Sequence, residues 1–272
     1  MVNPTLHCPC NRRIGETSST YTSPPPGETA FDLRGQIYRR SYWRCGICRH
    51  EFAQHNLDLS GLYDGAYVEN TYGDRMRETF DRIVSLPPER SDNERRVSRV
   101  TTFASTHFDG GRIPRLLDIG SGLGVFPYAM KRLGWNCTAL DPDIRAATHL
   151  KEVVGVSTVI GDFFNSRIDD LGLFDVVTLN KVIEHVEDPV KMLARAKTLL
   201  KSDGFLYVEV PDVQAAAEGR FREEYFIEHH HVFSAASLSL CGERAGLSLV
   251  RTEHFREPSG KYTLAGCFTA VY

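Results

Sequence analysis

The chain has 272 residues, enough for one α/β domain and a small additional unit, because single cores grow to roughly 250 residues before a chain divides. Hydrophobic residues make up 42% and charged residues 25%, which excludes a mostly disordered or fibrous protein. The net charge of -3 and the pI near 6.4 supply no broad positive field, so strong sequence-independent binding to nucleic acid or to an anionic membrane is not expected. A small neutral or anionic metabolite is the expected partner.

The N-terminal residues and the cysteines indicate a compartment. Residues 1–10 have no basic segment followed by an apolar run, and no stretch approaches the roughly 18 apolar residues that a membrane helix needs. We therefore expect a cytoplasmic protein that contacts no membrane. The seven cysteines are then expected to be thiols or metal ligands, because the cytosol keeps thiols reduced.

Residues 1–58 are predicted to form a small irregular module. They are poor in helical periodicity and contain the run Thr-Ser-Pro-Pro-Pro-Gly at positions 22–27, which continues neither a helix nor a central strand. Two pairs of cysteines lie here, and four thiolates satisfy the tetrahedral coordination of Zn²⁺, which stabilises segments with little core. We predict a zinc-ribbon-like module with a structural Zn²⁺, held by Cys8, Cys10, Cys45 and Cys48.

The spacing of the first cysteine pair leaves one zinc ligand open. Cys45 and Cys48 have the ordinary CxxC spacing, whereas Cys8 and Cys10 are separated by a single residue. A nearby histidine is therefore an alternative to Cys10, and the candidates are His7, His50 and His55. Four free thiols in a flexible arm are the simpler interpretation of the same pattern.

From Pro114 onward, short apolar runs alternate with helical stretches, which is typical of a parallel sheet covered on both faces. The last two runs follow each other with no helix between them, so we expect a hairpin at the sheet edge. The sequence predicts an α/β domain over residues 91–272, with a Rossmann-like, seven-stranded, mostly parallel sheet and helices on both faces. The predicted strands are residues 115–119, 137–140, 157–160, 174–179, 205–210, 247–253 and 263–271.

The first of these strands runs directly into a glycine-rich turn. Residues 116–124 read Leu-Leu-Asp-Ile-Gly-Ser-Gly-Leu-Gly, and a helix is expected to start near Val125. Glycines permit positive φ and close backbone approach, so a ligand can lie against the turn and the helix N-terminus. Asp141 follows the second strand, 23 residues beyond Asp118, where an acid can accept hydrogen bonds from both hydroxyls of a ribose. A lone glycine turn is often only a tight connection, but turn and acid together predict a nucleotide-like ligand.

With these motifs, residues 92–272 resemble the class I S-adenosylmethionine methyltransferases. The glycines run GxGxG, whereas nicotinamide enzymes have GxGxxG, and Val125 stands where their third glycine or alanine packs. The resemblance implies that Asp162 and Phe163 hold the adenine and that Asn180 begins the segment lining the methionine end. It implies S-adenosylmethionine as the cofactor, with contacts from Asp118, Gly120, Ser121, Gly122, Gly124, Asp141, Asp162, Phe163 and Asn180.

Residues 59–90 are predicted to form a helical linker that also acts as a lid. The segment is aromatic and ends at two consecutive prolines. Three tyrosines are many hydroxyl-bearing aromatic residues for a short connection, and an aromatic face near a sulfonium gains cation–π attraction. We expect Tyr72 to contact the cofactor and Tyr63 and Tyr67 to contact the acceptor. Packing between the two modules is the alternative.

A zinc module followed by this domain is similar to the deoxysugar C-methyltransferases of antibiotic pathways and to related surface-glycan methyltransferases. In those enzymes a segment EHxxxFS is placed beside the substrate, and residues 228–234 match it. The resemblance implies that His229 is the general base, because a neutral histidine can accept a proton near pH 7. It also implies that Glu228 orients the ring of His229 or binds a sugar hydroxyl. Contacts to the acceptor are further expected from Glu184, His185 and His231.

These residues have simpler interpretations as well. Glu184 could be a first-turn acid favoured by the helix dipole, and His185 a helix-start histidine bonded to backbone. The Glu228–His229 pair could only tie its loop to the sheet. Residues 229–231 are three adjacent histidines, but neighbouring side chains of an extended segment point to opposite sides, which disfavours a metal site made by all three.

The expected function is transfer of a methyl group from S-adenosylmethionine to a small polar acceptor, most plausibly a nucleotide-activated sugar or a glycan unit. The longer C-methyltransferases carry a further C-terminal domain that this sequence does not match, so O-, C- and N-methylation all stay open, as does the oligomeric state. The alternative is an RNA or protein methyltransferase whose zinc module docks a macromolecule through Arg34, Arg39, Arg40, Arg44 and Arg49.

Overall fold

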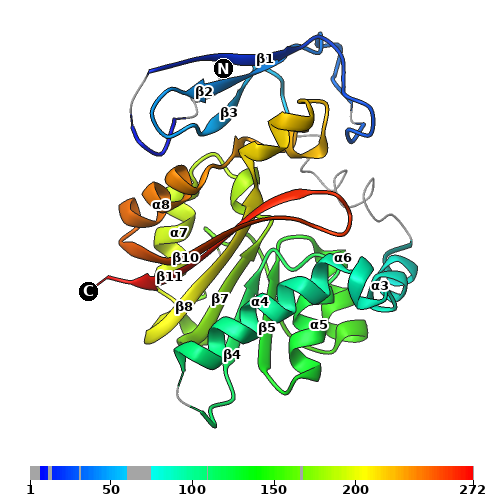
Figure 1. Cartoon of the computed structure of the whole chain (residues 1–272). Coiled ribbons are helices and arrows are strands. Elements are labelled where there is room, and N and C mark those ends of the chain that lie inside the picture. Colours follow the sequence, from blue (N-terminus) through cyan, green and yellow to red (C-terminus); the bar gives the residue numbers. More distant parts are fainter. Residues whose placement is uncertain are drawn as a thin grey trace.

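A computed structural model of the protein describes residues 7–11, 14–30, 32–59, 75–108, 110–165 and 168–271. Within these residues the larger sheet has seven strands in the order β10-β11-β8-β7-β4-β5-β6, as Figure 1 shows. The strands from β4 to β8 are parallel, and β11 pairs antiparallel with both β8 and β10. The strands are β4 (Arg115–Ile119), β5 (Asn136–Asp141), β6 (Ser157–Ile160), β7 (Phe174–Asn180), β8 (Leu200–Pro211), β10 (Leu247–Arg256) and β11 (Tyr262–Ala270).

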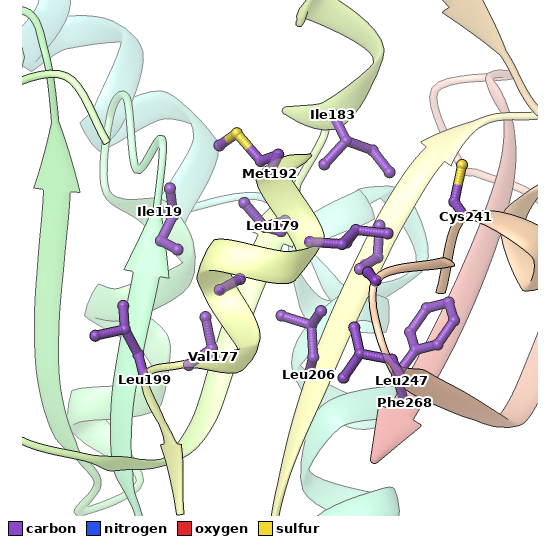
Figure 2. Close-up of a cluster of buried hydrophobic side chains, with 14 of the residues drawn as sticks. Ile119, Val177, Leu179, Ile183, Met192, Leu199, Leu206, Cys241, Leu247 and Phe268 are labelled. Carbon is purple, nitrogen blue, oxygen red and sulfur yellow. The ribbon is translucent and has the colours of Figure 1, made fainter. Parts of the chain in front are cut away.

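Helices cover both faces of this sheet. Leu116 packs with residues of α3 to α6 on one face, and its neighbour Leu117 packs with α7 and α8 on the other, because successive side chains of a strand point to opposite sides. Figure 2 shows the second core, in which Leu179 of the sheet lies near Met192 of α7 and Leu206 lies near Leu247. The helices are α3 (Met76–Val84), α4 (Asp92–His107), α5 (Val125–Arg132), α6 (Ile144–His149), α7 (Pro189–Lys197) and α8 (Ala235–Arg244).

The predicted Rossmann-like α/β fold is therefore confirmed, together with its seven strands and the edge hairpin of β10 and β11. The helix starts follow from local capping. The hydroxyl of Ser91 accepts a hydrogen bond from the amide of Glu94 at the start of α4, and Asp188 caps α7 ahead of a proline in its first turn. Strand β8 begins five residues before its predicted start. No helix among the described residues combines the length and apolar character needed to cross a bilayer.

A smaller antiparallel sheet lies beyond one end of the large one (Figure 1). In the described part of the chain its order is β1-β2-β3-β9, and its last strand comes from the chain that follows β8. Glu51 of β3 pairs with Val232 of β9, and the amide of Ala53 donates to the carbonyl of His230 at 2.8 Å. The strands are β1 (Gly15–Tyr21), β2 (Arg40–Cys45), β3 (Glu51–Gln54) and β9 (His231–Val232).

Buried polar contacts reinforce this junction. The guanidinium of Arg40 and the carboxylate of Glu28 form an ion pair at 2.6 Å with both side chains almost fully buried. The same carboxylate accepts a hydrogen bond from the amide of Ile227 at 2.7 Å. The hydroxyl of Tyr42, in β2, donates to the carbonyl of His229 at 2.6 Å. Residues 226–232 are thus held by the N-terminal sheet, a contact that the sequence did not predict.

The packing of α8 against β11 generates a first prediction. A Cβ atom added at Gly242 would lie 2.3 Å from the ring of Phe268, which is fully buried. Gly242→Val should therefore lower the free energy of unfolding by about 1–3 kcal/mol, the usual cost of overpacking a core. Thermal denaturation measures the change. Gly110→Val is the matched control, because Gly110 faces open space. Equal melting temperatures for the two variants would contradict this account of the helix–sheet packing.

Candidate cofactor and acceptor site

The glycine-rich turn lies between β4 and α5 and is packed closely on both sides. Gly120 has a φ of 71°, and a Cβ atom there would lie 2.7 Å from Val182. Gly124 has a φ of 69°, and a Cβ atom there would lie 2.4 Å from Leu150. Both positions exclude larger residues by conformation and by space. The turn consequently presents bare backbone at the carboxyl end of β4, next to the N-terminus of α5.

Asp141 ends β5 and faces this turn. Its carboxylate accepts hydrogen bonds from the amides of Gly122, at 2.8 Å, and Asp143, at 3.0 Å. The side chain is buried, and the loss of solvent raises its pKa above the ordinary value. A carboxylate accepts about four hydrogen bonds, so two backbone donors leave capacity for the hydroxyls of a ribose. The geometry fits the role that the sequence assigns to this acid.

Asp118 and Asn180 join the ends of β4 and β7 beside the turn. One carboxylate oxygen of Asp118 accepts from the hydroxyl of Thr178, at 2.6 Å, and from the amide nitrogen of Asn180, at 2.9 Å. Burial raises the pKa of Asp118 to about 6. The side-chain oxygen of Asn180 is buried without a hydrogen-bond partner. It is an acceptor available to a donor of a bound ligand, such as the ammonium of a methionine moiety. The carbonyl of Asp118 accepts from the hydroxyl of Ser121.

Asp162 and Phe163 follow β6, as predicted, on the far side of β5 from this pair. The carboxylate of Asp162 accepts hydrogen bonds from the amides of Phe164 and Asn165, which closes its own turn. The ring of Phe163 is buried in the core under α7. The amide of this turn and the second carboxylate oxygen of Asp162 are the groups that could meet an adenine. Tyr63, Tyr67 and Tyr72, which we assigned to a lid, lie outside the described residues.

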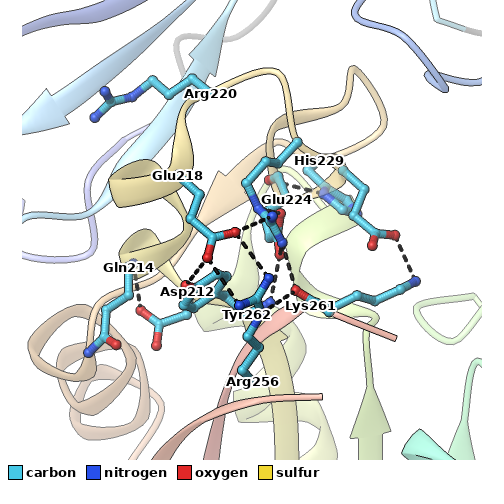
Figure 3. Close-up of polar contacts among 12 residues, drawn as sticks. Asp212, Gln214, Glu218, Arg220, Glu224, His229, Arg256, Lys261 and Tyr262 are labelled. Carbon is cyan, nitrogen blue, oxygen red and sulfur yellow. Dashed lines mark hydrogen bonds and ion pairs between the residues drawn. The ribbon is translucent and has the colours of Figure 1, made fainter. Parts of the chain in front are cut away.

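A cavity of about 290 Å³ opens at the carboxyl ends of β7 and β8. It lies near the turn, because Lys181 lines it and the adjacent Val182 packs against Gly120. Its mouth carries charged and polar side chains, shown in Figure 3, including the ion pair of Lys261 with Glu223 at 2.7 Å. The amide of Tyr262 donates to the carboxylate of Glu224, which fixes the hairpin against residues 223–225. The cavity is lined by Gly27, Thr29, Lys181, Glu184, His185, Pro211, Glu223, Glu224, Phe226, Glu228, His229, Lys261 and Tyr262.

Four of the predicted site residues meet in this cavity: Glu184, His185, Glu228 and His229. The rings of His185 and His229 lie edge to face with centroids 4.8 Å apart. Nδ1 of His229 lies 3.1 Å from the carbonyl oxygen of Glu224, and Nδ1 of His185 lies 2.9 Å from the carbonyl oxygen of Glu228. Backbone carbonyls therefore orient both rings. The contact at Nδ1 of His229 belongs to the backbone of Glu224, whereas the sequence predicted that Glu228 orients this ring or binds a sugar hydroxyl.

Burial sets the protonation of these groups. Loss of solvent and the neighbouring imidazole hold the pKa of His229 well below its usual range, and burial lowers the pKa of His185 to about 4. Both rings are neutral at pH 7. Burial raises the pKa of Glu184 and of Glu228 to about 7 each. Glu184 is fully buried, and neither of its carboxylate oxygens has a hydrogen-bond partner. Glu184 lies in a short helical turn, Ile183–His185, which begins three residues after the end of β7.

His231 lies elsewhere. It belongs to β9, and its side chain is fully buried against the N-terminal sheet, where its Nδ1 lies 3.0 Å from Nε2 of His50. His50 in turn contacts the hydroxyl of Ser237 in α8 at 3.1 Å. The pleat turns successive side chains of residues 229–231 in different directions, so His229 faces the cavity and His231 faces the junction of the two sheets. The assignment of His231 to the acceptor has no support from this geometry.

The four N-terminal cysteines gather in one cluster. Their sulfur atoms all lie within 4.8 Å of one another, and the sulfur atom of Cys8 is 3.1 Å from that of Cys48. A tetrahedral zinc with bonds of 2.3 Å has sulfur–sulfur edges of about 3.8 Å, so these four donors would hold the ion once their closest sulfur atoms move apart by several tenths of an ångström. The histidine alternatives to Cys10 are not part of the cluster among the described residues, and His50 is already bonded to His231.

Sequence reasoning missed the side chains that fix residues 226–232. Glu28, Arg40 and Tyr42 lie far from these residues in the chain, and no local motif marks them. It also missed Lys181, whose left-handed φ of 59° turns the chain sharply after β7. Such a conformation is uncommon outside glycine and occurs at functional sites. The charged residue directly after a buried strand was the available signal.

Comparisons with known proteins identify the family. A family model described as a methyltransferase domain matches residues 76–252, more than half of the chain. The chain belongs to the methyltransferase family. The ubiquinone biosynthesis O-methyltransferase of Xanthomonas campestris pv. campestris (strain B100) is 34% identical over 110 residues, which cover 38% of this chain and 45% of that protein. This methyltransferase thus spans about half the length of the curated relatives it matches.

Solved structures show the same fold. The 1,6-didemethyltoxoflavin N1-methyltransferase of Burkholderia thailandensis superposes with a TM-score of 0.56 at 16% identity, covering 82% of this methyltransferase and 96% of that chain. The magnesium protoporphyrin IX methyltransferase of Synechocystis PCC 6803 superposes with a TM-score of 0.56 at 14% identity. The superposition covers 76% of this methyltransferase and 100% of that chain. At these identities the likeness shows the fold, which agrees with the class I architecture predicted from the glycine turn.

The position of Asp141 generates the second prediction. Asp141→Ala should weaken the binding of S-adenosylmethionine by about 1.5–3 kcal/mol, because it removes charge-assisted contacts to hydroxyls and loosens the glycine turn. Isothermal titration calorimetry measures the affinity. Asp203→Ala, which removes an exposed carboxylate of β8 paired with Arg112, serves as the control. Unchanged affinity in the Asp141 variant would contradict the assignment of this site.

Proposed function

We propose that this protein transfers the methyl group of S-adenosylmethionine to a small polar acceptor bound in the cavity at the ends of β7 and β8. The observation that carries the proposal is the adjacency of two features. The glycine turn with Asp141 matches a nucleoside-binding cradle, and the cavity beside it holds neutral imidazoles and buried carboxylates. A cofactor lying along the turn with its methionine end at Asn180 would point toward this cavity, because Asn180 and Lys181 are consecutive.

The cofactor supplies the electrophilic methyl group. The chain's own residues would bind it through the predicted contacts, with Asp141 on the ribose, the turn of Asp162 and Phe163 on the adenine, and Asp118 and Asn180 near the methionine end. The buried oxygen of Asn180 without a partner supports this orientation. The remaining task of the protein is to hold an acceptor atom close to the methyl group and in line with the leaving sulfur.

His229 is the proposed general base. The N–H at its Nδ1 donates to the carbonyl of Glu224, so Nε2 of the neutral ring carries the lone pair. An acceptor hydroxyl that donates to this nitrogen would lose its proton as its oxygen bonds to the methyl carbon. Glu184, His185 and Glu228 are proposed to bind further hydroxyls of the acceptor. Tyr63, Tyr67 and Tyr72 are proposed to cover it.

We propose a sugar-like acceptor, either a nucleotide-activated sugar or a glycan unit. The carboxylates and imidazoles that line the cavity are the groups that bind sugar hydroxyls, and the match of residues 228–234 to EHxxxFS supports this class. The alternative, an RNA substrate at a basic face, is disfavoured because several of the arginines are neutralised within the module. Arg40 pairs with Glu28, Arg44 with Glu16, and Arg34 with Asp58.

We also propose that the chain divides into a zinc module (residues 1–58), a linker (59–90) and the methyltransferase domain (91–272). The clustered cysteines support Zn²⁺ in the first unit, and α3, which lies in the second, packs Met76 and Phe80 against the core of the third. Because β9 completes the sheet of the zinc module, the module would position the cavity residues 226–229.

The role of His229 generates the third prediction. His229→Ala should lower the turnover rate on the order of 10²-fold or more with little change in S-adenosylmethionine affinity, as expected when a base is lost. Turnover is measured as release of S-adenosylhomocysteine with a panel of nucleotide-activated sugars, and cofactor affinity by calorimetry. His107→Ala removes an α4 imidazole that does not line the cavity and should behave as wild type. Normal turnover by the His229 variant would show that positioning alone carries the reaction.

The cysteine cluster generates the fourth prediction. Protein purified without chelator should hold about one zinc per chain, and Cys45→Ser should release it because three ligands bind the ion less tightly than four. Metal analysis and limited proteolysis of the N-terminal residues report the two effects. Since the module holds residues 226–232, turnover should fall more than cofactor affinity. Cys137→Ala, in β5, should keep its zinc. Wild-type protein without zinc would contradict the prediction.

A further inference from the structure

Three side chains of the cavity form a second group of potential metal ligands. One ligand atom from each of Glu184, His185 and His229 lies within 4.8 Å of the other two. The residues come from two segments, the turn after β7 and the stretch before β9, which are joined where the amide of His230 donates to the carbonyl of Glu184 at 2.7 Å. Two imidazoles and one carboxylate are a ligand set that binds divalent transition metals.

The carboxylate of Glu184 is the observation that points to a ligand. The side chain is fully buried at the cavity wall, and both of its oxygens are buried without a hydrogen-bond partner. A buried carboxylate that lacks partners is costly, so such groups are normally compensated by hydrogen bonds, a counter-charge or a metal. Two cations lie near Glu184, Lys181 and Lys261. Among the described residues neither forms an ion pair with it: the ammonium of Lys181 donates to the hydroxyl of Thr263 at 2.8 Å, and Lys261 pairs with Glu223.

The two histidines are oriented as metal ligands usually are. In each ring Nδ1 lies within hydrogen-bond distance of a backbone carbonyl, that of Glu228 for His185 and that of Glu224 for His229. An N–H donated at Nδ1 leaves the lone pair of a neutral imidazole on Nε2, and a carbonyl acceptor behind a ligating histidine fixes both its tautomer and its direction. The backbone carbonyls therefore fix the tautomer and the orientation of both rings in the absence of an ion.

We propose that Glu184, His185 and His229 bind a divalent cation, whose remaining coordination positions face the cavity and take oxygen atoms of the acceptor. This inference rests on the proposed function and narrows its substrate class to acceptors with a hydroxyl, and best with two neighbouring hydroxyls that can chelate the ion. A bound cation lowers the pKa of a coordinated hydroxyl. His229 then acts as a ligand, and the hydroxyl proton leaves to water instead of to its imidazole.

Manganese is the probe that separates this site from the cysteine cluster. Mn²⁺ is bound by imidazole and carboxylate but poorly by thiolates, so zinc-loaded full-length protein should bind one further Mn²⁺ per chain. Binding is followed by the loss of the electron paramagnetic resonance signal of free Mn²⁺, with no cofactor or acceptor present. Glu184→Gln keeps the shape of the side chain and removes its charge, and should weaken Mn²⁺ binding at least about 10-fold.

Two more variants complete the experiment. Glu223→Gln alters a carboxylate at the mouth of the same cavity, outside the triad, and should leave Mn²⁺ binding unchanged. Lys181→Met removes a positive charge beside Glu184 and should tighten Mn²⁺ binding, which tests the site even if the Glu184 variant does not fold. Absence of saturable Mn²⁺ binding to the wild type, or equal effects of the Glu184 and Glu223 substitutions, would overturn the inference.

The test of the cation site can be distinguished from the test of the proposed function. Calorimetry with S-adenosylmethionine on the same protein samples reports the cofactor site alone. Cofactor binding without Mn²⁺ binding would overturn the cation site and leave His229 as the base. Mn²⁺ binding without cofactor binding would overturn the proposed function, because the ion site would then serve another reaction. Added Mn²⁺ that increases turnover of wild type but not of Glu184→Gln would support the cation site together with methyl transfer to the acceptor, with His229 as a metal ligand and not as the general base.

Discussion

The attachment of residues 226–232 to the N-terminal sheet is the contact on which the rest of the site depends. This stretch leaves the carboxyl end of β8, adds β9 to the edge of β3, and returns to start α8. Tyr42 holds the carbonyl of His229, and the Arg40–Glu28 pair holds the amide of Ile227. The N-terminal sheet is therefore a structural part of the candidate active site.

The second constraint is the common edge of the parallel strands. Because β4, β5 and β7 run in the same direction, their final residues Ile119, Asp141 and Asn180 meet along one side of the sheet. This brings a glycine-rich backbone turn, a buried acid and a polar amide together without long-range loops. The cavity lies immediately beyond, at β7 and β8, so one sheet edge supplies both a cradle for a nucleoside and a place for an acceptor.

Much of this could be read from the sequence because the signals are local. The alternation of apolar runs and helical stretches predicted the seven strands. The glycine turn and the acid that follow the first two strands predicted a ligand site at the carboxyl ends of the strands. The gathering of Glu184, His185, Glu228 and His229 followed from a family resemblance, and the cavity they share supports it without testing their roles. The four cysteines predicted a cluster that the structure contains.

Other features depend on contacts between distant segments and leave no pattern in the chain. Pairing of β3 with β9 joins residues about 180 positions apart, and a strand of two residues is too short for a period to show. The backbone carbonyls that orient the two histidines also leave no pattern in the sequence. Glu224 was not predicted to act on His229, and it orients this ring through its backbone carbonyl and not through its carboxylate. His231 was predicted to contact the acceptor together with His229. In the structure the strand pleat directs its side chain away from the cavity.

The central claim is that the cofactor cradle and the cavity form one active site. A crystal structure with S-adenosylhomocysteine bound tests it most directly, through the direction in which the thioether sulfur of the ligand points. The expected structure has the ribose at Asp141 and the sulfur facing the cavity, close to His185 and His229. A ligand bound along the glycine turn with its sulfur directed away from these histidines would contradict the account, as would one bound elsewhere.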